Sequence, residues 1–268
     1  ALAGTLNLTP ASSGNYAWNN ALTGAGMLNV TLGAGTDKFT FGTGTGTAYA
    51  GAVNMQKGEY VLNAKVGNDN ILSNGTLRLS GSGSTVLDAN YTIGGLDMNG
   101  GTLKVQTENG KPKGVLTVTD LDISGGGKVA MNVSGSIDPG SASNLFADSV
   151  GTSQSQIVKA TGDVTVGVSL TLTDYAGNSL SIGIVLAHNQ PAGTNVAEAY
   201  YTYTLIVNST DDKGIFVGSG LSRINSYTAG TLYKLTNDGT DNTMAARLTS
   251  TEAGTDADTG ATVLGGFE

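Results

Sequence analysis

The chain has 268 residues, of which 41 are glycine and 4 are proline, and it contains no cysteine. Its net charge of −8, without any cluster of lysine or arginine, argues against nucleic acid as a partner because nothing would neutralise a run of phosphates. The lack of cysteine excludes disulfides, thiolate metal sites and a cysteine nucleophile. Abundant glycine with only 13% charged residues is typical of a folded, turn-rich β protein.

A short pattern, a glycine followed by alternating apolar and polar residues, recurs along the first half of the chain. Its copies begin at Gly4, Gly26, Gly75, Gly101, Gly114 and Gly127. Each copy predicts a short strand with one face toward a core, and one such strand cannot bury that face alone. The repeat therefore favours a solenoid in which neighbouring coils supply each other's core.

Further short strands are predicted between and around these copies. In chain order the predicted strands cover residues 27–32, 38–41, 52–55, 59–62, 70–72, 76–79, 85–87, 91–98 and 102–105. Strands this short suit coils of three strands, with roughly twenty residues per coil and roughly a dozen stacked coils. Glycine-rich corners at 81–84 and 125–127 would let one strand turn into the next.

The second half is less regular. Residues 136–155, with the turn signal Asp138-Pro139-Gly140, are predicted to be a connecting loop between coils at 1–135 and further coils at 156–268. The strands after residue 156 are longer and more aromatic, so a pair of them could form a hairpin or small sheet before a loop-like C-terminal end. No run of about eighteen apolar residues predicts a membrane-spanning helix, and the first residues lack the basic region of a signal peptide. We therefore expect a processed product or a piece of a longer protein.

Several segments, taken in order, carry a resemblance to a known family. They are residues 22–30, 93–103 and 118–125 in the first half, and 156–165, 170–174, 201–205 and 214–221 in the second. Together they resemble the passenger region of bacterial type V autotransporters of the AIDA-like adhesin group. The resemblance implies an all-β fold, a right-handed parallel β-helix, that is exported through a C-terminal β-barrel of the parent protein. It also implies a place at the bacterial cell surface, anchored in the outer membrane or released.

The sequence predicts no enzyme and no cofactor. The single histidine, His188, lies beside a proline turn, and no Gly-Asp-Ser-Gly motif of a serine protease occurs. The pair Asp211-Asp212 is the nearest approach to the two carboxylates of a glycosidase, but the Asn-Thr-Asp and His-Gly motifs of the pectin-type enzymes are missing. A polysaccharide-degrading β-helix enzyme therefore remains a remote alternative.

Three aromatic residues are the candidate binding residues. Tyr201 and Tyr203 share one face of a predicted strand, where they could stack on a sugar, contact a protein or pack inside the fold. Trp18 is either a contact residue or a cap over the first coil. Turns such as 68–70 and 237–241 leave weak calcium binding open, but no EF-hand loop or calcium-binding glycine repeat predicts a metal site.

Rows of threonine, serine and asparagine along the side of such a rod predict a function in surface contact. Many weak hydrogen bonds, repeated along the length, add up through avidity. We expect a non-enzymatic adhesin for bacterial self-association and biofilm formation or for attachment to a host surface, with an identical passenger or a host matrix protein or glycan as its partner. The alternatives are host binding without self-association and a stalk that presents a distal tip. We expect no direct membrane insertion of this segment.

Overall fold

The computed structural model describes residues 1–108, 111–132, 151–177, 184–186, 195–228, 254–256 and 262–263, with side chains for 1–108, 112–132, 154–177 and 205–218. This part of the chain is almost entirely β-structure, as predicted, with one short 3-10 turn at Thr43–Thr45. None of its helical segments is long and apolar enough to cross a membrane.

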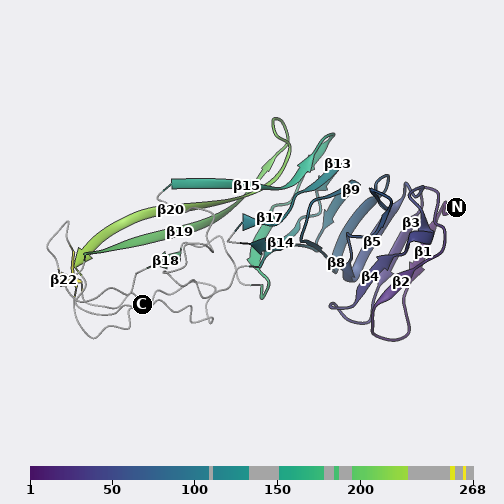
Figure 1. The fold of residues 1–268 in the computed structure, drawn as a ribbon, viewed down its shortest axis with the longest axis horizontal. Helices are drawn as coiled ribbons and strands as arrows, with labels where there is room; N and C mark the ends of the chain where they lie inside the picture. Colours follow the sequence, from purple (N-terminus) through teal and green to yellow (C-terminus); the bar gives the residue numbers. More distant parts are fainter. Residues whose placement is uncertain are drawn as a thin grey trace.

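The strands follow one another closely from the N-terminus (Figure 1). Those of the first half are β1 (Thr5–Leu8), β2 (Tyr16–Trp18), β3 (Met27–Thr31), β4 (Lys38–Phe41), β5 (Ala52–Tyr60), β6 (Lys65–Val66), β7 (Asp69–Asn70), β8 (Thr76–Leu87), β9 (Tyr91–Asn99), β10 (Thr102–Val105), β11 (Thr107–Glu108), β12 (Lys111–Pro112), β13 (Leu116–Ile123) and β14 (Gly127–Met131). Those of the second half are β15 (Gly151–Ala160), β16 (Val164–Val166), β17 (Leu170–Asp174), β18 (Ile184–Leu186), β19 (Asn195–Asn208), β20 (Gly214–Thr228), β21 (Gly254–Asp256) and β22 (Thr262–Val263).

Most of these strands belong to one large, mostly parallel sheet that contains three ladders. The first ladder runs β1, β3, β5, β8, β9, β13 and β16, and every pairing in it is parallel. The second runs β2, β4, β5, β8, β10, β14 and β17, also parallel throughout. The third joins β9, β13 and β15 in parallel and ends on β20, which is antiparallel to β15. Strands from successive passes of the chain therefore lie directly beside each other.

Long strands pass from one ladder to another by bending at a glycine. The predicted strands 52–55 and 59–62 largely merge into β5, whose first part pairs with β3 and whose last residues pair with β4. Gly58, at φ 106°, lies between the two parts, in a backbone region that L side chains rarely adopt. The predicted strands 76–79 and 85–87 likewise form the single strand β8, which bends at Gly81 with φ 56°. The predicted corner at 81–84 is therefore a bend inside a strand.

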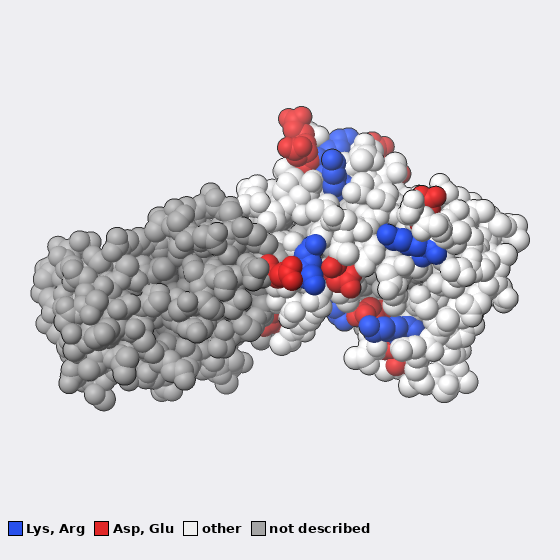
Figure 2. Space-filling model, in the orientation of Figure 1, with Lys and Arg blue, Asp and Glu red and all other residues white. Residues whose placement is uncertain are grey.

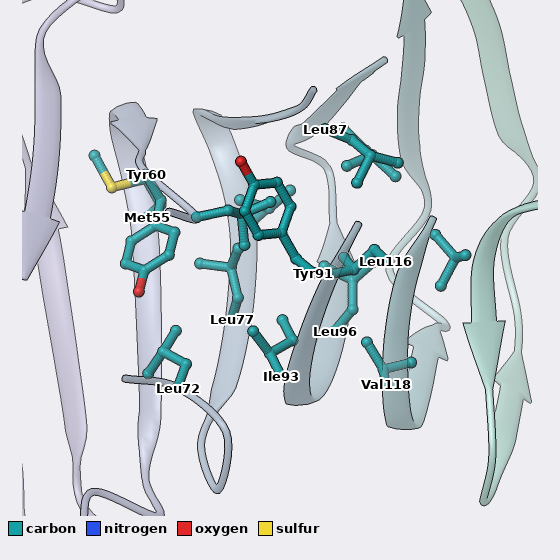
Figure 3. Close-up of a cluster of buried hydrophobic side chains, with 14 of the residues drawn as sticks. Met55, Tyr60, Leu72, Leu77, Leu87, Tyr91, Ile93, Leu96, Leu116 and Val118 are labelled. Carbon is teal, nitrogen blue, oxygen red and sulfur yellow. The ribbon is translucent and has the colours of Figure 1, made fainter. Parts of the chain in front are cut away.

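The core is built from apolar residues that occupy equal positions in neighbouring strands. In the first ladder these are Leu28, Val53, Leu77, Leu96 and Leu121, each at most 1% exposed. Figure 3 shows side chains of successive strands, such as Leu77 and Leu96, stacked along the core. Each buried leucine contributes about 1.5–3 kcal/mol relative to an exposed one, so the predicted repeat is the main source of the core.

An aromatic cluster fills the core near the N-terminal end of the second ladder. Phe39 packs edge-on against Phe41 with ring centroids 5.1 Å apart, and it stacks on Tyr16 at 6.1 Å. Tyr60 lies beside both phenylalanines. Such pairs add to the stability beyond the area they bury.

The second half continues the parallel pattern with β16 and β17 and departs from it at β19 and β20. β19 and β20 form a long antiparallel hairpin, of the kind that the sequence suggested, and with β15 it extends beyond the stack (Figure 1). These two strands form no further parallel coil. Residues 151–155, predicted as the end of the connecting loop, belong to β15, because their backbone pairs with β20. Residues 136–150 of that predicted loop lie outside the described residues.

Candidate functional site

A line of polar side chains crosses the outer face of the first ladder. Asn29 lies between Leu28 and Val30, which are both fully buried, so its side chain leaves the strand on the opposite face. Residues at the same register position in neighbouring strands form what we call the outer polar row: Asn7, Asn29, Asn54, Arg78, Asp97 and Asp122. The strand spacing of about 4.8 Å sets the repeat along this row.

The asparagines of the outer polar row are linked to each other. The Asn29 Nδ2 donates to Asn7 Oδ1 at 2.8 Å, and the Asn54 Nδ2 donates to Asn29 Oδ1 at 2.9 Å. Ser80 Oγ donates to Asn54 Oδ1 at 2.7 Å. Because a side-chain amide has two N–H donors and two acceptor lone pairs, these bonds use only part of its capacity. Asn54 is buried, Asn29 is half-buried and Asn7 is exposed, so the free capacity is greatest near β1.

The other half of the row is charged. Arg78 Nη1 lies 3.3 Å from Asp97 Oδ2, and the two side chains are 32% and 20% exposed. Burial raises the pKa of Asp97, and the nearby carboxylate of Asp122 raises it further, whereas Arg78 opposes both effects. The row thus changes from neutral amides through an ion pair to an acidic end. On the face shown in Figure 2, basic and acidic residues of the described part are intermixed.

The amides, the guanidinium group and the carboxylates of this row can donate and accept hydrogen bonds and pair charges. Polar rows in general were predicted from the sequence, but these six residues were not. A signal was present, since Asn7 and Asn29 are 22 residues apart and Asn29 and Asn54 are 25 apart. The pairing of Arg78 with Asp97 depends on the register between β8 and β9, which the repeat alone did not specify.

Of the predicted aromatic residues, Trp18 lies on a different element from Tyr201 and Tyr203. Trp18 is half-buried in β2, packs against the core and donates its Nε1–H to the Asn20 carbonyl at 2.8 Å. Tyr201 and Tyr203 lie in β19, opposite Leu221 and Ser219 of β20, and their side chains are outside the described part. In Figure 1, β2 lies near the N-terminal end and β19 in the extended hairpin.

In the described part of the chain, Asp211, Asp212 and the turn at 68–70 form no assembled site. Asp211 and Asp212 are exposed in the turn between β19 and β20, where Asp212 has φ 44°. His188 and residues 237–241 lie outside the described residues. Asn70 uses its side chain within its own turn, donating to the Leu62 carbonyl and accepting from the backbone N–H of Leu72. Where the chain is described, no three His, Cys, Asp or Glu residues gather in a way that could hold a metal ion.

Comparisons with known proteins add one similarity. No protein-family profile matches the chain, and no solved structure matches it. The chain is 28% identical over 248 residues to a protein of Escherichia coli (strain K12) described as the uncharacterized lipoprotein YdeK. The match covers 83% of this chain and 18% of that protein, so the chain spans less than a fifth of the relative's length.

Proposed function

We propose that the chain is part of the passenger region of an autotransporter adhesin, folded as a right-handed parallel β-helix, and that it acts without catalysis through self-association at the bacterial surface. The β-helix is supported by the ladders, whose strands pair in parallel and in register and bend at glycines between ladders. A location in the cell envelope is supported by the lipoprotein name of the relative.

The outer polar row is the feature that supports the proposed self-association. Two copies that lie antiparallel, with a two-fold axis between Arg78 and Asp97, place each Arg78 opposite the other copy's Asp97. The same axis places the register position of Asn54, whose side chain is buried, opposite Asp122. A surface that complements itself in this way forms an isologous contact, in which both copies use the same patch.

The strength of one such contact is modest. A hydrogen bond contributes about 0.5–1.5 kcal/mol net, and an exposed ion pair about 0–1 kcal/mol. Because a cell displays many copies, these weak contacts would act together through avidity. Salt would weaken the charged part, since exposed charges are screened over about 8 Å at physiological ionic strength.

Settling of bacteria that display the chain tests the proposal. Wild-type cells should clump in plain buffer. Cells with Arg78→Glu should stay dispersed, because carboxylates would face each other, and so should cells with Asp97→Arg, because guanidinium groups would. A mixture of the two variant populations should clump again, since each new charge then meets its opposite.

Two controls make the result specific. Lys65→Glu has a similar charge change on the exposed hairpin strand β6, away from the row, and should clump like the wild type. Circular dichroism and urea unfolding of the purified variants test whether each one folds. Failure of wild-type cells to clump would contradict self-association and favour a host ligand or a stalk. Failure of the mixture to recover, with folded variants, would show that the row is not the contact.

A further inference from the structure

A second surface feature, a cleft of about 460 Å³, lies on the outer side of the second ladder. Its walls come from β4, β5, β8, β9 and β10, from residues that adjoin these strands, and from the turn that follows β17. The residues that matter for its chemistry are Lys38, Glu59, Asp88, Lys104 and Tyr175. None of them belongs to the outer polar row, so the two surfaces are independent.

The charged groups of the cleft compensate each other. Lys104 Nζ donates to Glu59 Oε2 at 3.1 Å, and Lys38 Nζ lies 3.5 Å from Glu59 Oε1. The Glu59 side chain is only 13% exposed, so both ammonium groups are held on one partly buried carboxylate. Asp88 adds a second carboxylate. Two lysines and two acidic residues carry no net charge, so the cleft has no strong preference for an anion or a cation.

One oxygen of the Asp88 carboxylate accepts a hydrogen bond from Tyr91. Tyr91 Oη donates to Asp88 Oδ1 at 2.5 Å, and the pKa of Tyr91 is raised to about 12, chiefly by burial and also by this carboxylate. A carboxylate has two oxygens with about four acceptor positions, so one bond from Tyr91 leaves most of its capacity for a ligand. Gln106 and Asn63 add amide groups along the walls.

Tyr175 presents an aromatic ring at the same place. It is 41% exposed, and the other exposed large hydrophobic side chains in the described part are aliphatic: Leu6, Val66, Val166 and Val168. Partial burial, together with the charges of Glu59 and Asp88, raises the pKa of Tyr175 to about 12, which agrees with a phenol close to both carboxylates. A half-exposed ring beside polar groups offers an apolar surface and hydrogen bonds to one ligand.

We infer that this cleft binds a neutral saccharide unit. The apolar C–H face of a sugar ring fits against Tyr175, and its hydroxyl groups find acceptors at Asp88 and Glu59 and donors at Lys104 and Gln106. The balance of charge disfavours phosphate, sulfate and free cations, and the polar lining disfavours a purely apolar ligand. The volume falls in the range of about 300–1,000 Å³ that is usual for small-ligand sites. The inference does not depend on self-association.

The test is binding of the purified chain to immobilised neutral oligosaccharides of glucose, galactose, mannose and N-acetylglucosamine, beside sialylated and sulfated glycans. At least one neutral glycan should bind, and added salt should not weaken its binding, because no net charge is involved. Tyr175→Ala should then weaken binding of that glycan by about tenfold or more, measured by calorimetric titration. Tyr175→Phe keeps the ring and should stay within about threefold of the wild type.

Val168→Ala is the matched control, since Val168 is 59% exposed in the link that leads to β17 and does not line the cleft. It should bind like the wild type. Binding that is limited to sialylated or sulfated glycans, binding that Tyr175→Ala leaves unchanged, or no binding to any neutral glycan would each overturn the inference. The folded Arg78→Glu variant should retain glycan binding, so failure of the saccharide site and failure of self-association can be distinguished.

Discussion

Replacing the same residue at two positions of the first ladder tests whether burial depends on neighbouring coils. Leu77 and Leu6 occupy corresponding register positions, but Leu77 is fully buried between Val53 and Leu96, whereas Leu6 is 37% exposed on β1. Leu77→Ala should lower the free energy of unfolding by about 2–5 kcal/mol, because strands on both sides prevent the cavity from collapsing. Leu6→Ala should cost less than about 1 kcal/mol, because much of its side chain already contacts water.

Urea unfolding followed by circular dichroism measures both variants. In a chain of this size, the Leu77 variant should also melt about 4–20 °C below the wild type. Equal losses for the two variants would contradict the reasoning, since they would mean that coverage by neighbouring strands does not determine the contribution of a leucine. A loss below about 1 kcal/mol for Leu77→Ala would contradict it as well.

Three further substitutions test close packing and electrostatics. A Cβ at Gly83 would lie 1.8 Å from the Met55 carbonyl oxygen, so Gly83→Ala should cost more than about 2 kcal/mol in urea unfolding. A Cβ at Gly35 would lie in open space, so the free energy of unfolding of Gly35→Ala should stay within about 0.5 kcal/mol of the wild type. Similar losses at both sites would refute the close contact at Gly83. Asp88→Asn should lower the pKa of Tyr91 from about 12 toward 10, read by ultraviolet titration of the phenols, although burial keeps it raised. The folded chain holds the phenol proton of Tyr91 more tightly than the unfolded chain does, so the contribution of Tyr91 to stability should fall between about pH 10 and 12 in the wild type. In the Asp88→Asn variant this fall should be smaller. An unshifted pKa of Tyr91 in that variant would refute the role of Asp88.

The fold could be predicted where the local alternation of apolar and polar residues determines the structure. The alternation around Leu28 and Leu103 identified strands with one buried face, and both leucines are fully buried in parallel strands. Strand ends were less predictable at glycines. The sequence predicted breaks at residues 56–58 and 81–84, yet the backbone bends at Gly58 and Gly81 and the strand continues, because neighbouring strands supply hydrogen bonds on both sides of each bend.

The candidate surfaces were harder to predict from the sequence, because they depend on the register between neighbouring strands. Arg78 and Asp97 are ordinary polar residues of two strands until the pairing of β8 with β9 makes them neighbours. The cleft was harder still to predict, because Tyr175 joins Glu59 and Asp88 in its lining only after the chain has passed through β10, β14 and β17. The aromatic candidates Tyr201 and Tyr203 were selected by local density, a signal that does not report what surrounds a side chain.

The second and third ladders imply different orders of assembly. Between β5 and β8, Thr85 Oγ1 donates to the Tyr60 carbonyl 25 residues earlier, so each new pass of the chain can dock on one already in place. β15 can dock on β13, but its second partner comes later, because Gln156 Nε2 donates to the Lys213 carbonyl 57 residues further on and β20 pairs with the strand. A chain emerging with its N-terminus first would therefore add its parallel strands one after another, and the hairpin strand β20 would pair with β15 last.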